Sequence, residues 1–305
     1  MNSVTNLLKE LRNATQAGFM DCKKALEATA EEITKLGKGA KEHLELAIKW
    51  LRENGMAKAA NKNAAKVAAE GLALAAADEK GVALFELNTQ TDFTAASADV
   101  VKLAEQILAA MLSAKVSSLE EVKDLKLADG HTVNEECLEL SSKTGEKIEL
   151  RRVIYYSLQP NQSVGLYVHN NKKIASFIVF ENTADAEKLK GMAMHLTAMD
   201  PRFLDETQVD QQWLNNEKAI LESQLAQEGK PKEFAGKIIE GRIKKLLAEV
   251  CLVSQPYILD DAKTVGEYAQ SLNVKPVLMH RFKVGDGIEV AEVDFASEVA
   301  AQMRK

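Results

Sequence analysis

The sequence has little cysteine, no long apolar run and no excess of positive charge. Three cysteines in 305 residues, far apart and without a C-x-x-C pair, are typical of a reducing compartment and of a chain without structural zinc. No apolar stretch approaches the roughly 18 residues that span a membrane. The 39 Lys and Arg are outnumbered by 45 Asp and Glu, which argues against direct binding to nucleic acid. We therefore expect neither a membrane nor nucleic acid as a partner.

The amino terminus also lacks targeting signals. Residues 1–12 lead directly into an amphipathic charged segment. They have neither the apolar core of a signal peptide nor the Arg- and Ser-rich, acid-poor composition of a transit peptide. The sequence therefore predicts a cytoplasmic location.

Motifs for catalysis and for cofactor binding are missing as well. There is no G-x-x-x-x-G-K-[ST] phosphate loop, no G-x-G-x-x-G after a strand and no G-x-S-x-G elbow. The five histidines lie far apart, without an H-E-x-x-H motif or a paired metal spacing. Cys22 lies among charged residues, but a buried helical cysteine is the better interpretation. We expect no catalytic residue, no metal ligand and no cofactor, so the chain is predicted not to be an enzyme.

Residues 1–55 have the pattern of a three-helix module. Apolar residues recur at helical spacing in the first and third helices, a turn near Gly18 precedes the second, and Gly55 is expected to end the third. The Gly- and Lys-rich stretch 34–41 is interpreted as an extended surface loop. Residues 56–70, rich in Ala and Lys, predict a helical connector.

Two similar units follow this module. Alternating apolar residues predict a β-hairpin over 72–87, followed by a helix over 100–111 and two short helices that begin with capping boxes. Three more strands and a helix come next, with the strands at 148–156, 164–169 and 174–180. The segment Gly81–Asn88 is similar to Ile174–Asn182. We therefore expect an α+β fold with a duplicated antiparallel sheet-plus-helix core.

The remaining chain is predicted to be mostly helical. Two charged helical stretches, 211–227 and 232–249, share a narrow apolar seam and are separated by Gly229 and Pro231. This pattern predicts an antiparallel helical hairpin that projects from the second half-core. The tail is expected to hold a short helix at 265–271, a strand at 275–284 and a final helix that begins at Phe295.

The expected domain boundaries follow from these elements. They define a three-helix module over 1–55 and a first core subdomain, which includes the connector, over 56–146. A second core subdomain covers 147–262, with the hairpin inserted at 206–249, and a C-terminal helical module covers 263–305.

Two segments contain residues that folding explains poorly. The segment Thr91–Phe93 follows the second strand of the first half-core and has polar and small neighbours, suited to presenting one aromatic side chain outward. A phenylalanine here could also simply cap the core. In the stretch Arg12–Leu26, a module this small cannot easily bury both Phe19 and Met20, so one of them is expected to face a partner.

These segments closely resemble the elongation factor Ts family. The N-terminal signature of that family, approximately R-x-x-T-G-A-G-M-M-D-C-K-K-A-L, is matched by Arg12–Leu26, and its T-D-F-V-A motif by Thr91–Ala95. The resemblance extends over nearly the whole chain through Gly229–Glu233, Glu240–Arg242 and Asp294–Ala300.

The chain departs from the family pattern at a few positions. Gln16, Phe19 and Thr94 stand where the family usually has Gly, Met and Val. The loop expected at 34–41 looks longer than in the family. The motif around Asp92 is otherwise kept.

The resemblance implies a guanine-nucleotide exchange factor for elongation factor Tu. The chain would bind the GDP form of this GTPase, disturb its magnesium and phosphate site, promote GDP release and be displaced by GTP. The second half-core and the C-terminal tail would hold other faces of the partner.

The resemblance also assigns roles to residues. His169 would contact the partner near its phosphate loop. A ubiquitin-associated-type N-terminal module would bind the partner's nucleotide-binding domain through Lys9, Leu11, Arg12, Phe19 and Met20. The loop that enters beside the partner's magnesium site would consist of Thr91, Asp92, Phe93 and Thr94.

A second class of function competes with this one. A ubiquitin-associated-like domain fused to a scaffold could recruit peptides or a replication complex. In that case residues 1–55 alone would carry the affinity, whereas nucleotide exchange requires the core loop. The sequence leaves open a monomer, a homodimer or a two-plus-two complex with the partner, and also what the helical hairpin binds.

Overall fold

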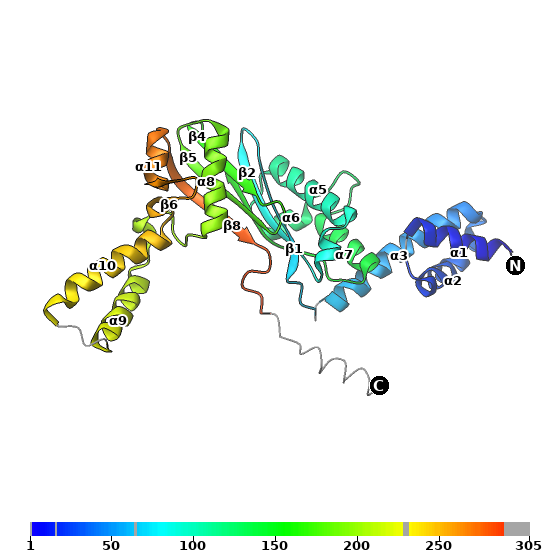
Figure 1. Cartoon of the computed structure of the whole chain (residues 1–305). Coiled ribbons are helices and arrows are strands. Elements are labelled where there is room, and N and C mark those ends of the chain that lie inside the picture. The colour runs from blue at the N-terminus through cyan, green and yellow to red at the C-terminus, as the bar shows by residue number, and fades with distance from the viewer. Residues whose placement is uncertain (1, 16, 64–65, 228–231, 290–305) are drawn as a thin grey trace.

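The computed structural model describes residues 2–15, 17–63, 66–227 and 232–289. The molecule is elongated, with three helices at the N-terminal end, two sheets and their covering helices in the centre, and two long helices at the opposite end (Figure 1). The expected α+β class is confirmed. Among the described residues, no helix is both long enough and apolar enough to cross a bilayer. The final helix expected from Phe295 lies outside them.

The N-terminal helices are α1 (Asn2–Thr15), α2 (Phe19–Leu36) and α3 (Ala40–Asn63). Along each helix, apolar residues recur three or four positions apart, so each helix turns one stripe toward the other two. The buried side chains of this small core are Leu7, Leu11, Cys22, Ala25, Leu26 and Ala47.

The extended loop expected at 34–41 is wrong. Helix α2 continues through the first part of this stretch to Leu36 and is capped by Gly37, whose left-handed backbone (φ 61°) suits a helix end. The amide of Lys38 donates to the carbonyl of Ile33 (3.3 Å), and α3 starts at Ala40. The connection is therefore a tight turn.

The expected end of the third helix at Gly55 is also wrong, because α3 continues well beyond this residue. Gly55 lies where α3 packs against α7 (Val133–Thr144), and a Cβ atom built on it would lie 2.6 Å from Oγ of Ser142. Two ion pairs also join α3 to α7. The glycine thus permits close contact between helices, and one continuous helix connects the N-terminal module to the core.

The first sheet is antiparallel, with the strand order β1-β2-β3. Its strands are β1 (Glu70–Ala77), β2 (Gly81–Thr89) and β3 (Glu149–Ser157). The helices on its outer side are α4 (Asp92–Ala95), α5 (Ala98–Ala114), α6 (Leu119–Asp124) and α7. As the sequence predicts, Ser118 and Thr132 begin α6 and α7 with capping boxes.

The second sheet is antiparallel as well, with the order β4-β5-β8. Its strands are β4 (Gln162–Val168), β5 (Ile174–Glu181) and β8 (Lys275–Lys283). The helices that share its outer core are α8 (Ala186–Met199) and α11 (Val265–Ser271). The smaller elements nearby are η1 (Glu206–Gln208), η2 (Leu252–Ser254), β6 (Pro256–Tyr257) and β7 (Asp260–Thr264).

The two sheets pack face to face. Leu84 of β2 and Phe177 and Val179 of β5 belong to one buried cluster between the sheets. Phe85 of β2 points the other way and joins a second cluster under α5. Every residue of β2 is buried, as expected of a strand that is covered on both faces. The layers therefore run helices, sheet, sheet, helices (Figure 1).

The connectivity supports the duplication expected from the sequence. In each half, a hairpin is followed by helices, and a third strand then pairs with the second strand of the hairpin. Both of these later pairings, β2 with β3 and β5 with β8, contain an irregularity in register. It lies at Glu86/Leu87 in β2 and at Val179/Phe180 in β5, which is the same position within the two similar segments.

Two strands belong to different units from those that the sequence suggests. The boundaries inferred above place β3 in the second core subdomain, 147–262, but β3 pairs with β2 and completes the first sheet. They place β8 in a separate C-terminal module, 263–305, but β8 pairs with β5 and completes the second sheet. Periodicity identifies a strand but not its partner, because the partner is distant along the chain.

Helices α9 (Gln211–Gln227) and α10 (Lys232–Val250) lie side by side and extend away from the sheets (Figure 1). Leu225 and Ile243 of the expected apolar seam are buried. Near the base of α9, the ring of Trp213 packs against Phe203, with centroids 5.5 Å apart. The expected tip of the hairpin, at 228–231, lies outside the described residues.

Glu86 is a buried charge where the sheets meet the chain after β8. Its carboxylate accepts hydrogen bonds from Arg151 (3.1 and 3.2 Å), from Arg152 and from the amide of Gly285 (2.8 Å). The Arg152 guanidinium also lies over the ring of Phe282, 4.2 Å from its centroid. Glu86 therefore links β2, β3 and the segment that follows β8.

Replacement of Glu86 tests the importance of this link. Glu86→Ala leaves two guanidinium groups without their carboxylate, and we expect the free energy of unfolding to fall by about 3 kcal/mol, the lower end for a broken buried pair. Glu149→Ala removes a half-exposed partner of Lys147 and should cost less than about 1 kcal/mol. Urea unfolding followed by circular dichroism measures both. Equal losses would show that Glu86 has no special role.

Candidate functional site

The segment 91–94 begins α4, a single helical turn between β2 and α5, where the sequence suggests a loop. The side chain of Thr91 caps this turn by accepting a hydrogen bond from the amide of Thr94 (3.3 Å). Ala95 faces inward and is buried in the first core, while Phe93 points away from it. The expected loop is thus a capped helical turn with an inner and an outer side.

Phe93 is strongly exposed. It shows 84% of its surface to solvent, more than any other exposed large hydrophobic side chain among the described residues. Asp92 beside it is exposed too. The alternative that this phenylalanine caps the core is therefore wrong. An apolar surface of this kind, on a polar and charged turn, is suited to burial against another molecule.

The base of this turn is fixed by Glu146, a residue that the sequence did not single out. The Thr91 hydroxyl donates to Oε1 of Glu146 (2.9 Å), and the Thr91 amide donates to Oε2 (3.1 Å). Oε1 of Gln90 accepts from the Lys147 amide and from the Lys66 ammonium, both at 2.9 Å. The exposed side chains of α4 therefore stand on an anchored support.

His169 lies in the turn between β4 and β5 and is exposed. Its Nδ1 atom is 3.0 Å from Oδ1 of Asn171, and its ring meets Tyr167 edge-on with centroids 6.2 Å apart. These contacts orient the imidazole and leave part of it open to solvent.

Two contacts join this turn to the first sheet. The Ala73 amide donates to the carbonyl of Lys172 (2.7 Å), and the Lys173 ammonium binds Oε2 of Glu70 (2.7 Å). The hydrogen bond to Glu70 raises the pKa of Lys173, and the negative charges of Glu70 and Asp92 raise it further. Glu70 pairs with Thr89 just before α4, so its ion pair with Lys173 places the β4–β5 turn near α4. The structure brings together two segments that lie far apart in the sequence.

Four of the five expected contacts on the N-terminal module are exposed. Lys9 and Arg12 lie on the surface of α1. Phe19 and Met20, at the start of α2, expose 55% and 57% of their surfaces. Leu11 has no exposed surface and lies in the core of the module, so its assignment as a direct partner contact is wrong. It lies on the apolar stripe that holds α1 to the other helices.

The thiols and the buried imidazole have structural positions. Burial raises the pKa of Cys137 to about 12 and that of Cys251 to about 11, and it also raises the pKa of Cys22. His195 is buried, with Nε2 2.8 Å from Oε1 of Gln255, and burial lowers its pKa. Protonated thiols and a neutral, hydrogen-bonded imidazole fit packing better than nucleophilic or acid–base catalysis.

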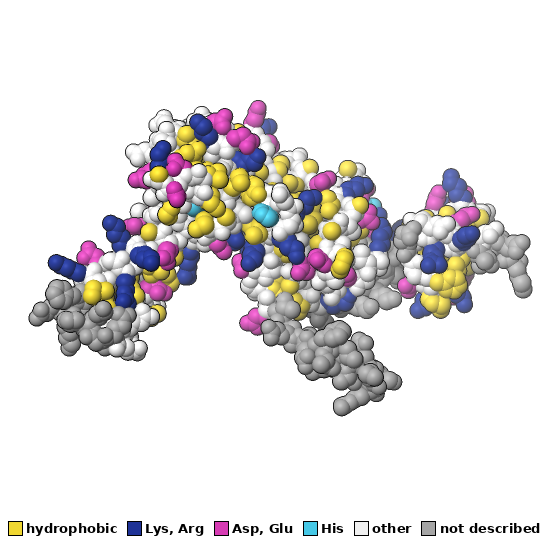
Figure 2. Space-filling model, viewed as in Figure 1, with side chains coloured by type: hydrophobic (Ala, Val, Ile, Leu, Met, Phe, Trp, Pro, Cys, Tyr) yellow, Lys and Arg dark blue, Asp and Glu magenta, His cyan; other side chains and the backbone are white. Residues whose placement is uncertain are grey.

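Figure 2 shows hydrophobic side chains gathered over the central body and over the N-terminal helices, while basic and acidic side chains are interspersed on the same face. The exposed residues that are expected to contact a partner thus stand on separate elements: the N-terminal helices, α4 and the β4–β5 turn. This arrangement is suited to the class of proteins that bind another macromolecule through several sites at once.

Comparison with known proteins identifies the family. The family model described as elongation factor TS matches residues 90–286. An elongation factor Ts of Mycoplasmoides gallisepticum is 42% identical over 305 residues, and one of Malacoplasma penetrans is 41% identical over 306, with both chains fully covered in each case. One of Mycoplasma genitalium is 37% identical over 312 residues, again with full coverage. The chain belongs to the elongation factor Ts family.

Membership in this family gives the chain its general function. It is a nucleotide exchange factor of translation elongation that acts on elongation factor Tu, and not an enzyme that catalyses a chemical reaction. The exposed elements described above are therefore candidates for the contact with that GTPase.

The exposure of Phe93 leads to a stability prediction. Phe93→Ala should change the free energy of unfolding by less than about 1 kcal/mol, because the side chain buries almost nothing. Phe85→Ala, in the neighbouring strand, removes a fully buried ring and should cost roughly 3–5 kcal/mol. Melting temperatures of the two variants provide the comparison. A similar loss in both would place Phe93 in the core.

Proposed function

We propose that the chain releases GDP from elongation factor Tu by inserting α4 beside the partner's magnesium site. The observation that carries this proposal is the geometry of Phe93, which is 84% exposed on a turn whose base is anchored by Glu146. Thr91–Ala95 also matches the family motif, with Thr94 in place of the usual Val. A rigid, outward-pointing aromatic residue next to a carboxylate is suited to entering an apolar slot of a partner.

The target site is sensitive to small displacements. Magnesium requires nearly ideal octahedral coordination by oxygen, and the bound nucleotide depends on both the ion and the contacts to its phosphates. Movement of one coordinating segment by about an ångström therefore weakens the whole site. Phe93 would supply the displacement, while Asp92 would compete for hydrogen bonds that orient the magnesium side of the partner.

Phe93 alone does not supply enough free energy. Its burial contributes roughly 1.5–3 kcal/mol, whereas loosening the nucleotide about a thousandfold requires ~4 kcal/mol. The remainder must come from other contacts that hold α4 in place. His169 on the β4–β5 turn is well placed for this role, because Lys173 and Glu70 tie that turn to the first sheet beside Asp92.

The N-terminal module would provide a second grip. We propose that its ubiquitin-associated-type fold docks on the partner's nucleotide-binding domain through Lys9, Arg12, Phe19 and Met20, all exposed on α1 and at the start of α2. Helix α3 continues unbroken from the module into its contact with α7, so binding there restricts where α4 can lie.

Thermodynamic linkage explains how the exchange factor is released from its partner after exchange. If the bound chain weakens nucleotide affinity by a given factor, bound nucleotide weakens the affinity of the chain by the same factor. Incoming GTP would therefore expel the exchange factor, which can then act on another GDP complex. We place this cycle in the cytoplasm. The second half-core, its helical hairpin α9–α10 and the tail would make further contacts with the partner. A homodimer of the chain and a two-plus-two complex with the partner are alternatives to a one-to-one complex.

The proposed insertion predicts a specific kinetic defect. Phe93→Ala should slow stimulated GDP release from elongation factor Tu by roughly tenfold or more, equivalent to ~1.4 kcal/mol, while the variant still binds through its other surfaces. Asp92→Ala should act in the same direction, and the double variant should lose less than the sum, because both side chains act on one site. Stopped-flow release of labelled GDP measures the rate.

Lys102→Ala, on the neighbouring helix α5, is a suitable control, because Lys102 is exposed and outside the proposed contact. Wild-type exchange by Phe93→Ala would exclude α4 as the inserted element. His169 would then be the next residue to test.

A separate prediction concerns the docking module. The double variant Phe19→Ala/Met20→Ala should bind nucleotide-free elongation factor Tu more weakly, by roughly thirtyfold if each side chain loses about 1 kcal/mol at the interface. Its melting temperature should stay close to that of the wild type, since both residues are more than half exposed. Calorimetric titration measures the affinity. Undiminished affinity would remove the module from the proposed contact.

A further inference from the structure

A histidine and two carboxylates converge near the start of α7, away from α4. Nδ1 of His131 lies 3.4 Å from Oδ1 of Asp129 and 3.5 Å from Oε1 of Glu136. The three potential ligand atoms all lie within 4.8 Å of one another. The His131 Nδ1 atom is buried and makes no hydrogen bond within the described structure.

The loop that holds two of these residues is ordered by its own backbone. The amide of Leu127 donates to the carbonyl of His131 (2.8 Å), and the amide of Gly130 donates to the carbonyl of Leu127 (2.9 Å). The His131 amide donates to Oδ1 of Asp129 (3.0 Å), and this hydrogen bond lowers the pKa of Asp129. The carboxylate of Asp129 is therefore held beside the imidazole.

Negative charge is in excess around this cluster. Asp129, Glu136 and Glu139 are the nearby carboxylates, while Arg52 contacts the last two and Lys143 contacts Glu139 alone. A bound cation would offset this excess of negative charge.

We propose that Asp129, His131 and Glu136 form a binding site for one divalent transition-metal cation of the zinc type. One imidazole nitrogen and two carboxylate oxygens are ligands that such ions accept, with the remaining positions filled by water. Ligand atoms about 2.1 Å from a metal lie roughly 3.0–3.4 Å apart at tetrahedral or octahedral angles. The observed separations from His131 to its two neighbours need little adjustment to reach this range.

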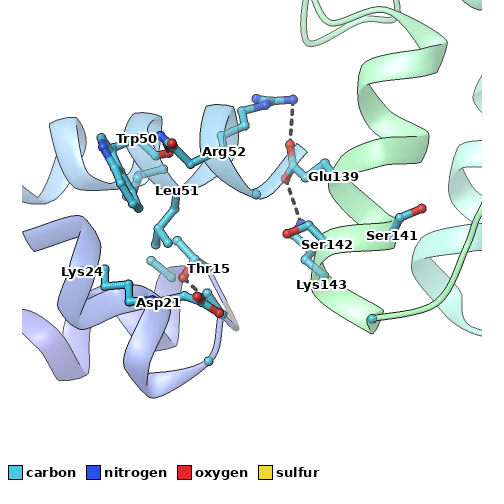
Figure 3. A pocket seen from close by; sticks show the side chains of 17 residues that line it. Thr15, Asp21, Lys24, Trp50, Leu51, Arg52, Glu139, Ser141, Ser142 and Lys143 are labelled. Atoms are coloured by element: carbon cyan, nitrogen blue, oxygen red, sulfur yellow. Dashed lines mark hydrogen bonds and ion pairs between the residues drawn. The ribbon is translucent and has the colours of Figure 1, made fainter. Parts of the chain in front are cut away.

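This site shares a ligand with the junction between the N-terminal module and the core. Nη2 of Arg52 on α3 binds Oε1 of Glu136 (2.6 Å), the same oxygen that faces His131, and it also binds Oε2 of Glu139 (2.8 Å). Figure 3 shows Arg52 reaching from α3 to Glu139 at the edge of a cleft of about 600 Å³. A bound cation would displace Arg52 from Glu136 and leave it paired with Glu139. Metal binding and this ion pair therefore compete.

The test is titration of the full-length chain with zinc alone, in a buffer that does not chelate it, followed by calorimetry. We expect one site per chain. His131→Gln and Asp129→Asn should each weaken zinc binding by at least about tenfold, and magnesium should not compete, because it disfavours imidazole. His169→Gln, which removes a histidine outside this cluster, should leave the zinc affinity unchanged. Melting temperatures show that each variant is folded.

Two results would overturn the proposal. Absence of zinc binding at micromolar concentrations would mean that His131 serves only as a hydrogen-bonding or cationic neighbour of the carboxylates. Equal zinc affinity in the wild type and in folded His131→Gln would place the ion elsewhere.

The competition with Arg52 has its own test. Arg52→Gln removes the competing cation, so its zinc affinity should rise severalfold above that of the wild type. Arg52→Lys, which keeps the charge but cannot bridge two carboxylates in the same way, serves if Arg52→Gln is poorly folded, and it should also bind zinc more tightly. Unchanged or weaker zinc binding in the folded variant would show that Glu136 is not shared.

Discussion

Face-to-face packing of two three-stranded sheets is the constraint on which the rest of the structure depends. It buries β2 on both sides and places Phe177 and Val179 of β5 against the first sheet. Because the halves meet through β1, β4 and β5, the β4–β5 turn comes to lie beside α4. A chain with only one half-core would have the exposed phenylalanine but not the neighbouring histidine turn. The pairing of two half-cores therefore brings the two proposed contact elements close to each other.

Rigidity is the second requirement of an exchange factor that works by displacement. An inserted side chain moves its target only if its own support does not yield, and α4 has such a support in Glu146 and in the buried Ala95. Helix α3 connects the N-terminal module rigidly to the core, because it runs past Gly55 into close contact with α7. In the proposed mechanism, binding energy gained by the module is used at α4. The proposed contact residues are exposed, whereas the residues that support them are buried or paired.

Local sequence pattern predicted most helices and strands, because periodicity and capping are local properties. The capping boxes at Ser118 and Thr132 are examples. The polar neighbours of Phe93 favoured an outward side chain but left a core position as an alternative, which the structure excludes. Long-range pairing was not predictable in the same way: β3 and β8 were grouped with the wrong units, and Glu146 lies 55 residues from the Thr91 that it anchors. Glycine is ambiguous between a helix end and a close helix contact, which explains the error at Gly55. Leu11 lies just before the matched segment Arg12–Leu26, and only the packing shows that it faces inward.

The most direct test of the central claim is the rate of GDP release from elongation factor Tu, measured by stopped-flow fluorescence of labelled GDP at increasing concentrations of the full-length chain. Release should accelerate with the concentration of the chain until the complex is saturated, and added GTP should dissociate the chain from its partner. A release rate that stays at its spontaneous value, although the two proteins bind each other, would contradict the central claim.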